Sequence, residues 1–341
     1  MKPVIFGLEG ETLGAEERAL FRACEPAGYI LFGRNVASDR ADGRERLRAL
    51  TDALRDLHGR DDLLVMIDQE GGRVARLGPP LWPAFPAASR FADLYEVAPS
   101  SALEACRLNA QAIATMLRAA GITVDAMPLL DVRQADASAI MGDRSFGADP
   151  MRVAALGRAA LDGLAAGGVA GIVKHMPGHG RARVDSHEER PFVEADAAAL
   201  ESDLAPFRAL RSAPFGMMAH IVYPAWDAER PASQSPTVIR AIVRERIGFG
   251  GLLMTDDLAM KALDGAEPDR AAAAVAAGCD LALHCHGTVA ERAAVAGRLP
   301  DMTAETRARL DRAMAFAAEP LAGEPLEALT AQRDALLAVL A

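Results

Sequence analysis

The sequence predicts an α/β fold, a single-domain (β/α)₈ barrel of the TIM type. Eight short apolar runs recur along the chain, and longer amphipathic segments rich in Ala, Leu and Arg separate them. Apolar runs without polar alternation are typical of parallel strands that helices cover on both faces, and the alternation of strand and helix provides the crossovers of such a sheet. Unusual polar residues follow many of these runs, and a barrel would collect them in one ring at its carboxyl-terminal end.

The apolar runs give the positions of the predicted strands. We expect strands at residues 4–8, 29–33, 63–68, 122–131, 168–175, 216–223, 251–256 and 280–285. Helices are expected between them, for example in "SALEACRLNAQAIATMLRAAG" and "SPTVIRAIVRERIG", where apolar residues recur at helical spacing.

Polar residues at the ends of the predicted strands favour the barrel over its main alternative, a doubly wound open sheet. They are Asp68, Asp131, Lys174, His175, His220, Asp256 and His284. An open sheet would gather its ligands in a single crevice, and no G-x-G-x-x-G follows the first strand of this chain. We therefore expect these side chains to form one ring at the mouth of a barrel.

The predicted barrel accounts for the chain as a single domain, 1–341. A typical barrel takes ~250 residues, so we assign the surplus to long loops after the strands and to a C-terminal helical tail from about residue 303. The long loops are 70–98, 131–149, 176–195 and 221–236. No Pro- or Gly-rich linker separates two halves of the chain.

Composition and charge argue against several classes of partner. The chain has 341 residues and a net charge of −10, whereas nucleic acids and anionic membranes attract clustered Lys and Arg. No apolar run reaches the ~18 residues of a membrane span, and the first run meets Glu9 and Glu11 too soon for a signal peptide. The four cysteines are widely spread, as expected of reduced thiols. We expect a cytoplasmic protein that binds a small molecule.

The stretch "IVKHMPGHGRARVDSHEERP", residues 172–191, concentrates groups that can transfer protons. It holds three of the seven histidines and one of only three lysines, Lys174. His187 stands two residues after Asp185, so in an extended segment the carboxylate could orient the imidazole and raise its pKa, as a general acid/base requires. An exposed Asp-x-His on a solvated loop is the alternative interpretation.

Two aspartates in "MTDDLAM" follow the seventh apolar run. Side chains alternate along a strand, so one of Asp256 and Asp257 can face inward as a nucleophile or a metal ligand. The other can cap the helix that "LAMKAL" predicts, because Asp is favoured at a helix N-terminus.

Carboxylates and guanidinium groups gather in two glycine-containing stretches. "DQEGGRVARLG" contains Asp68, Glu70, Arg73 and Arg76, and "GDRSFG" contains Asp143 and Arg144. Such sets suit hydroxyl-rich ligands, because each sugar hydroxyl both donates and accepts a hydrogen bond. Structural salt bridges are the alternative. "HCHG" at 284–287 is a weak metal motif, because no matching cluster of ligands accompanies it.

The residues alone leave four functions open. One is a glycosidase that uses Asp256 and a proton donor, and another is an aldolase that forms a Schiff base on Lys174. The third is a metal-dependent hydrolase that uses the histidines and Asp256, and the fourth is a non-catalytic sugar-binding protein.

A series of motifs narrows these functions. "GYILFGRNV", "IDQEGGRVARL", "PLLDV", "GDRSFG", "KHMPGHGRARVDSHEERP", "MMAHIVYP" and "GLLMTDDLAM" follow one another between about residues 5 and 265. With them the chain resembles the compact single-domain β-N-acetylglucosaminidases of bacterial glycoside hydrolase family 3. The element that runs from Lys-His-x-Pro-Gly-His-Gly to Asp-Ser-His is the most specific of the motifs. Met176, Gly33 and Thr255 depart from the residues usual in the family, Phe, Ala and Ser, and leave each chemical group present.

The resemblance implies a retaining mechanism, in which Asp256 attacks the anomeric carbon and His187, partnered by Asp185, acts as the acid/base. The residues implied to bind the sugar are Asp68, Arg76, Arg144, Lys174 and His175. The implied substrate is N-acetylglucosamine β-1,4-linked to 1,6-anhydro-N-acetylmuramic acid, with or without a peptide, in cytoplasmic peptidoglycan recycling. No metal or organic cofactor is implied, and we expect a monomer.

Overall fold

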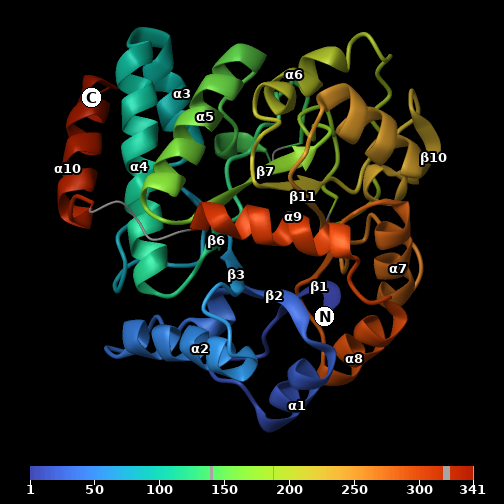
Figure 1. The fold of residues 1–341 in the computed structure, drawn as a ribbon. Coiled ribbons are helices and arrows are strands. Elements are labelled where there is room, and N and C mark those ends of the chain that lie inside the picture. The colour runs from blue at the N-terminus through green and yellow to red at the C-terminus, as the bar shows by residue number, and fades with distance from the viewer. Residues whose placement is uncertain (139–140, 187, 318–322, 341) are drawn as a thin grey trace.

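The computed structural model describes residues 1–341 except 139–140, 187, 318–322 and 341. Eight parallel strands close into a barrel in the order β1-β12-β11-β8-β7-β6-β3-β2. They are β1 (Lys2–Gly7), β2 (Pro26–Leu31), β3 (Leu64–Ile67), β6 (Val124–Asp125), β7 (Ala170–Met176), β8 (Phe215–Met218), β11 (Leu252–Asp257) and β12 (Leu281–His284). Helices surround these strands in Figure 1, and the predicted single-domain (β/α)₈ barrel is confirmed.

Helices lie around the barrel, either between successive strands or after the last strand. They are α1 (Ala15–Cys24), α2 (Gly43–His58), α3 (Ala88–Val97), α4 (Pro99–Ala119), α5 (Pro150–Ala166), α6 (Glu201–Ala209), η4 (Val238–Ile247), α7 (Glu267–Ala277), α8 (Val289–Arg298), α9 (Ala304–Met314) and α10 (Leu326–Leu337). Short 3₁₀ turns are η1 (Gly33–Asn35), η2 (Gly142–Arg144), η3 (Ala232–Gln234), η5 (Ala315–Ala317) and η6 (Ala338–Leu340). The two stretches in which helices were expected form α4 and η4, the latter with π-type hydrogen bonding.

The fourth predicted strand is shorter than its apolar run. Residues 122–131 pair with both neighbouring strands only in β6, and further on a single bridge joins Leu129 to Lys174. Pro128 lies between these pairings and has no N–H to donate, so the ladder cannot continue evenly through it. The apolar character of the run reflects burial rather than continuous pairing.

The sixth apolar run divides between two structures. Its first part is β8, and its last residues form β9 (Val222–Tyr223), which pairs with β10 (Asp227–Pro231) outside the barrel. Val222 also forms a parallel bridge with Phe192, near the end of the 176–195 loop. β9 therefore supports this loop instead of extending the barrel wall.

Two apolar layers hold the barrel together. Along β7, Ile172 packs inside the barrel, whereas Val173 packs under the surrounding helices. This alternation follows from the opposite directions of successive side chains in a strand. The interior is thus a packed core, and only the two ends of the barrel are available for a ligand.

The C-terminal helices cover parts of the barrel. α9 closes the amino-terminal end, where Leu310 and Met314 join the interior cluster and Arg309 Nη1 lies 2.8 Å from Asp280 Oδ1, just before β12. α10 packs along α4, as Figure 1 shows. The carboxyl-terminal end is therefore the end that remains open.

Among the helices in the described part of the chain, none combines the length and the apolar character that crossing a membrane requires.

Candidate active site

A cavity of about 410 Å³ opens where the carboxyl-terminal ends of the strands meet. Its lining includes Asp68, Arg76, Arg144, Lys174, His175 and Asp256. The structure therefore brings together all five residues expected to bind sugar and the expected nucleophile. A larger cavity of about 630 Å³ lies between residues 134–136 and 181–195, and none of these six residues lines it.

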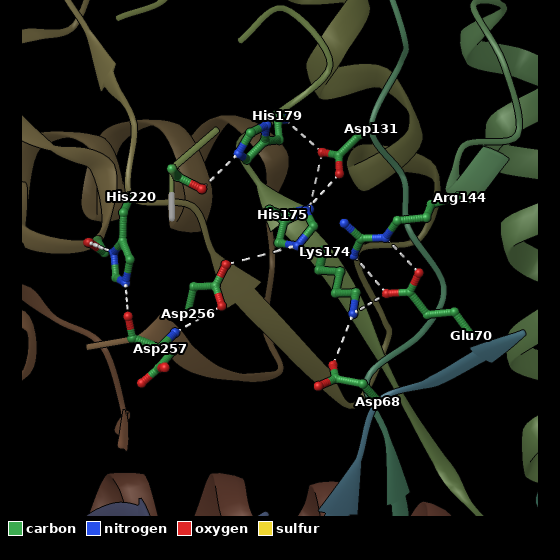
Figure 2. Close-up of polar contacts among 12 residues, drawn as sticks. Asp68, Glu70, Asp131, Arg144, Lys174, His175, His179, His220, Asp256 and Asp257 are labelled. Atoms are coloured by element: carbon green, nitrogen blue, oxygen red, sulfur yellow. Dashed lines mark hydrogen bonds and ion pairs between the residues drawn. The ribbon is translucent and has the colours of Figure 1, made fainter. Parts of the chain in front are cut away.

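Carboxylates and cations form a connected wall on one side of the pocket. Figure 2 shows Lys174 between two carboxylates, with its Nζ 2.6 Å from Glu70 Oε1 and 3.4 Å from Asp68 Oδ1. Arg144 binds Glu70 through two hydrogen bonds, both of 2.8 Å. Arg76 Nη2 lies 3.1 Å from Asp68 Oδ2. Three separate segments thus hold one network of hydrogen bond donors and acceptors.

The charges on this wall are fixed by their neighbours. Burial would raise the pKa of Glu70, but the Lys174 ammonium and the Arg144 guanidinium outweigh it and lower the pKa to about 2. For Lys174, burial acts to lower the pKa, yet Glu70 and Asp68 raise it above its ordinary value. Lys174 is therefore an ammonium at neutral pH and a hydrogen bond donor.

His175 links the wall to Asp256. Its Nδ1 lies 2.7 Å from Asp131 Oδ2, and its Nε2 lies 4.0 Å from Asp256 Oδ2. Asp131 is buried and also accepts hydrogen bonds from the backbone N–H groups of His175 and His179, at 3.1 Å and 2.6 Å. Burial would raise the pKa of Asp131, but His175 and His179 lower it to about 2. An ionised carboxylate thus orients the His175 ring.

The two aspartates after the seventh apolar run have different environments. Asp256 lines the cavity with a side chain that is 19% exposed, and its Oδ1 accepts a 2.8 Å hydrogen bond from the backbone N–H of Asp257. Asp257 Oδ1 accepts from the N–H groups of Ala259 and Cys285, at 3.2 Å and 3.1 Å. Both aspartates line the cavity, and Asp257 in addition holds the backbone of two neighbouring segments.

The prediction of a helix at "LAMKAL" is wrong. Residues 258–263 form turns, and the next helix is α7. The N–H of Leu263 donates to the Met260 carbonyl oxygen at 3.3 Å in a turn, and the N–H of Ala262 donates to the Ser186 carbonyl oxygen of the 176–195 loop at 3.2 Å. This long-range contact replaces the helical hydrogen bonds that the local pattern favoured.

The 176–195 loop contacts the site at its base and near its middle. The Tyr223 hydroxyl donates to the Gly178 carbonyl oxygen at 2.7 Å. Ser186 lines the cavity, and its Oγ lies 3.3 Å from Nε2 of the buried His179. Burial and the nearby His175 lower the pKa of His179 to about 4, which keeps it neutral at pH 7. The loop thus contributes two polar groups to the pocket.

The predicted Asp185 and His187 pair cannot be placed as a pair, because His187 lies outside the described residues. The carbonyl oxygen of Asp185 accepts hydrogen bonds from the N–H groups of Glu188 and Glu189, at 2.9 Å and 3.1 Å. The arrangement expected for an extended segment from Asp185 to His187 stays a prediction, because that segment includes His187. Asp185 directly precedes Ser186, which borders the cavity.

The other histidines of the predicted ring bind protein groups. His220 is buried and contacts Ser233 Oγ at 2.7 Å and the Asp257 carbonyl oxygen at 3.1 Å. His284 Nε2 lies 2.6 Å from Glu267 Oε2. His286, the second histidine of "HCHG", has its Nδ1 3.4 Å from Asp257 Oδ2.

The two histidines of the weak metal motif thus face different carboxylates. Across the described ranges, no group of three or more His, Cys, Asp or Glu side chains is arranged to hold a metal ion.

Sequence reasoning missed how three polar residues take part in the site. The sequence places Glu70 in a carboxylate and guanidinium set but does not show that it joins Arg144, 74 residues away, to Lys174. It likewise gives no contact between His179 and Ser186. These connections depend on the closed barrel, and no local spacing indicates them.

Comparison with known proteins identifies similar sequences. The sequence model of one protein family, the glycosyl hydrolase family 3 N terminal domain, matches residues 10–315 of this chain. A beta-hexosaminidase from Alkalilimnicola ehrlichii (strain ATCC BAA-1101 / DSM 17681 / MLHE-1) is 39% identical over 317 residues, which cover 91% of this chain and 88% of that protein. A beta-hexosaminidase from Thioalkalivibrio sulfidiphilus (strain HL-EbGR7) is 38% identical over 290 residues, with 83% and 80% covered.

Solved structures share the architecture. NagZ from Neisseria gonorrhoeae, in complex with N-trifluoroacetyl-D-glucosamine, aligns with a TM-score of 0.85 at 30% identity over 100% of this chain and 98% of that one. A glycoside hydrolase family 3 beta-N-acetylglucosaminidase from Paenibacillus sp. str. FPU-7 aligns with a TM-score of 0.82 at 29% identity, over 98% of this chain and 66% of that one.

Proposed function

Because the chain belongs to glycoside hydrolase family 3 and is a glycoside hydrolase of the β-hexosaminidase type, we propose that it is a retaining exo-β-N-acetylglucosaminidase. The observation that carries this proposal is the position of Asp256 in the cavity, opposite a wall of charged hydrogen bond partners. The Neisseria structure, which contains an N-acylated glucosamine, supports the choice of sugar.

The charged wall is proposed to bind the terminal sugar. Asp68 and the cations Lys174, Arg144 and Arg76 supply acceptors and donors for hydroxyl groups, and His175 adds an imidazole close to Asp256. A cavity of about 410 Å³ is in the size range of small-ligand pockets. We infer that one terminal sugar is held there while the rest of the substrate extends outward.

The proposed first step is nucleophilic. An Asp256 carboxylate oxygen attacks the anomeric carbon and forms a covalent glycosyl ester, while the bond from that carbon to the leaving oxygen breaks. A protonated His187 gives its proton to the leaving oxygen, so the departing group leaves as a neutral alcohol. Asp185 would stabilise the imidazolium form of His187.

The proposed second step returns the enzyme to its starting state. Neutral His187 accepts a proton from a water molecule as the water oxygen attacks the anomeric carbon, and the ester bond to Asp256 breaks. Two displacements restore the β configuration. The support for His187 and Asp185 in this role is the position of Ser186, which stands between them in the chain and lines the cavity.

We propose a peptidoglycan fragment as the natural substrate, namely N-acetylglucosamine β-1,4-linked to 1,6-anhydro-N-acetylmuramic acid, with or without a peptide. This proposal rests on the family resemblance of the motifs and includes a monomeric, cytoplasmic enzyme that works in peptidoglycan recycling without a cofactor. The Schiff-base alternative is disfavoured, because the carboxylates around Lys174 raise its pKa, and a Schiff base requires the neutral amine.

The test compares nitrophenyl β-N-acetylglucosaminide with the β-glucoside as substrates. We expect turnover of the N-acetyl substrate only, and for Asp256→Ala a loss in kcat of about 10⁴-fold or more, of the size seen when a nucleophile is removed. His187→Ala should retain more activity, because nitrophenol leaves with little acid assistance.

A matched control for this test is Asp269→Ala, which removes a carboxylate that is 68% exposed on α7, where it pairs with Arg298. Its kcat should equal that of the wild type. Full activity of Asp256→Ala would exclude it as the nucleophile, and absence of turnover by the wild type would reject the proposed substrate class.

A further inference from the structure

We propose that Glu70 is a positioning residue for sugar binding, which fixes Lys174 and Arg144 on the pocket wall without contacting the sugar. This inference rests on the sugar-binding roles proposed above for the two cations. Glu70 would act on the sugar through Lys174 and Arg144, whereas the residues proposed above face the ligand directly.

Glu70 is held on a well-anchored hairpin. It lies in β4 (Gln69–Gly71), which pairs with β5 (Val74–Ala75) directly after the end of β3. The Gln69 side chain accepts hydrogen bonds from the N–H groups of Arg76 and Leu77, both at 2.9 Å, and its Nε2 donates to the Leu77 carbonyl oxygen at 2.9 Å. The backbone that carries Glu70 therefore has a defined place beneath the pocket mouth.

Both oxygens of the Glu70 carboxylate are occupied by the two cations. Oε1 lies 2.6 Å from Lys174 Nζ and 2.8 Å from Arg144 Nη2, and Oε2 lies 2.8 Å from Arg144 Nε. The two hydrogen bonds to Arg144 define the plane and direction of its guanidinium group. Figure 2 shows this carboxylate between the two cations.

Glu70 lies behind the cations and not on the pocket surface. Its side chain is 5% exposed, and the described residues that line the cavity include Lys174 and Arg144 but not Glu70. A ligand in the cavity would therefore meet the ammonium and the guanidinium, and Glu70 could affect the ligand only through them.

The charge of Glu70 is what allows the two cations to lie close together. The positive charge of Arg144 acts against the protonated form of Lys174, and the Glu70 carboxylate offsets this repulsion. Asp68 cannot replace it, because Asp68 is 3.4 Å from Lys174 and also binds Arg76. Loss of the Glu70 charge should let Lys174 and Arg144 move apart and misplace both donors.

The test uses Glu70→Gln, which keeps the size of the side chain and removes its charge. We expect KM for the nitrophenyl β-N-acetylglucosaminide and the dissociation constant of free N-acetylglucosamine to rise about tenfold or more, the loss typical when the partner that orients a ligating group is removed. Glu70→Asp keeps the charge and should recover part of this affinity. A purely structural role would lower the unfolding temperature and leave both constants unchanged.

Glu267→Gln is the matched control, because it makes the same chemical change in a carboxylate whose partner, His284, does not line the cavity in the described structure. Wild-type constants are expected for it. If Glu70→Gln does not fold, Glu70→Asp decides: its shorter side chain cannot span both cations, so wild-type KM in that variant would overturn the inference.

The outcomes separate this inference from the proposed function. The inference about Glu70 would be rejected, and the proposed function kept, by the following set of results. The wild type turns over the substrate and Lys174→Ala raises KM, but Glu70→Gln has the KM and the dissociation constant of the wild type. No turnover by the wild type would reject the proposed function itself.

Discussion

Single residues in the pocket show how buried charges are stabilised by specific partners. Lys174 is 2% exposed and has two carboxylate neighbours, and the buried Asp131 receives three hydrogen bonds from His175 and His179. An isolated buried charge would be costly, so these partners are needed for the ionised forms to persist. The same partners hold each of these side chains in one orientation.

The ionised state of Asp131 predicts a pH-dependent contribution to stability. Its pKa of about 2 in the folded protein lies below the ordinary value of 3.8. Its contribution should therefore be complete above about pH 4 and should be lost as the pH falls toward 2. Asp131→Asn should lower the free energy of unfolding at pH 6 by roughly 1.5–3 kcal/mol, as expected when a hydrogen bond to a charged group is lost.

Urea denaturation of wild type and Asp131→Asn at pH 6, 4 and 3 measures this difference. The difference in free energy of unfolding between the two proteins should become smaller at the lowest pH, where the Asp131 carboxyl group of the wild type begins to be protonated. A difference of constant size across this range would contradict an ionised Asp131.

At the level of elements, the two ends of the barrel have different roles. The carboxyl-terminal end carries the pocket, the β4 and β5 hairpin and the 176–195 loop, and its polar groups are those proposed to bind the sugar. The amino-terminal end is covered by α9, whose Leu310 is buried in the interior cluster. Changes at the covered end should therefore affect stability much more than catalysis.

Leu310→Ala tests whether the covered end of the barrel affects stability more than catalysis. The truncation leaves a cavity in a packed core, so we expect the free energy of unfolding to fall by roughly 2–5 kcal/mol. Below the unfolding transition, kcat and KM should match the wild type. Val339→Ala, at a side chain that is 61% exposed, is the control and should change stability by less than about 0.5 kcal/mol. Equal losses in the two variants would contradict a role of α9 in closing the barrel.

At the level of the whole molecule, the fold class and the position of the site could be predicted from the sequence. Apolar runs and the polar residues after them depend on burial and local spacing, and both can be seen in a single chain. The contact of residues 258–263 with Ser186 could not, because it depends on a distant part of the chain. The link from Glu70 to Lys174 and Arg144 has the same cause. The break at Pro128, by contrast, has a local cause, since proline has no N–H to donate.

The predicted ring of polar residues at the strand ends could also be predicted only in part from the sequence. Asp256, Lys174 and His175 line the cavity as expected, but Asp131 and His220 lie behind it and bind protein groups. Strand ends identify the ring, whereas the direction of each side chain depends on its partners in the closed barrel.

The stereochemistry of hydrolysis tests the central claim, that Asp256 forms a covalent bond to the sugar, most directly. Proton NMR would record the anomer of N-acetylglucosamine that appears first from the nitrophenyl β-N-acetylglucosaminide, before mutarotation. Two displacements at the anomeric carbon predict the β anomer. The α anomer as first product would mean that water attacks directly, and it would contradict a nucleophilic role for Asp256.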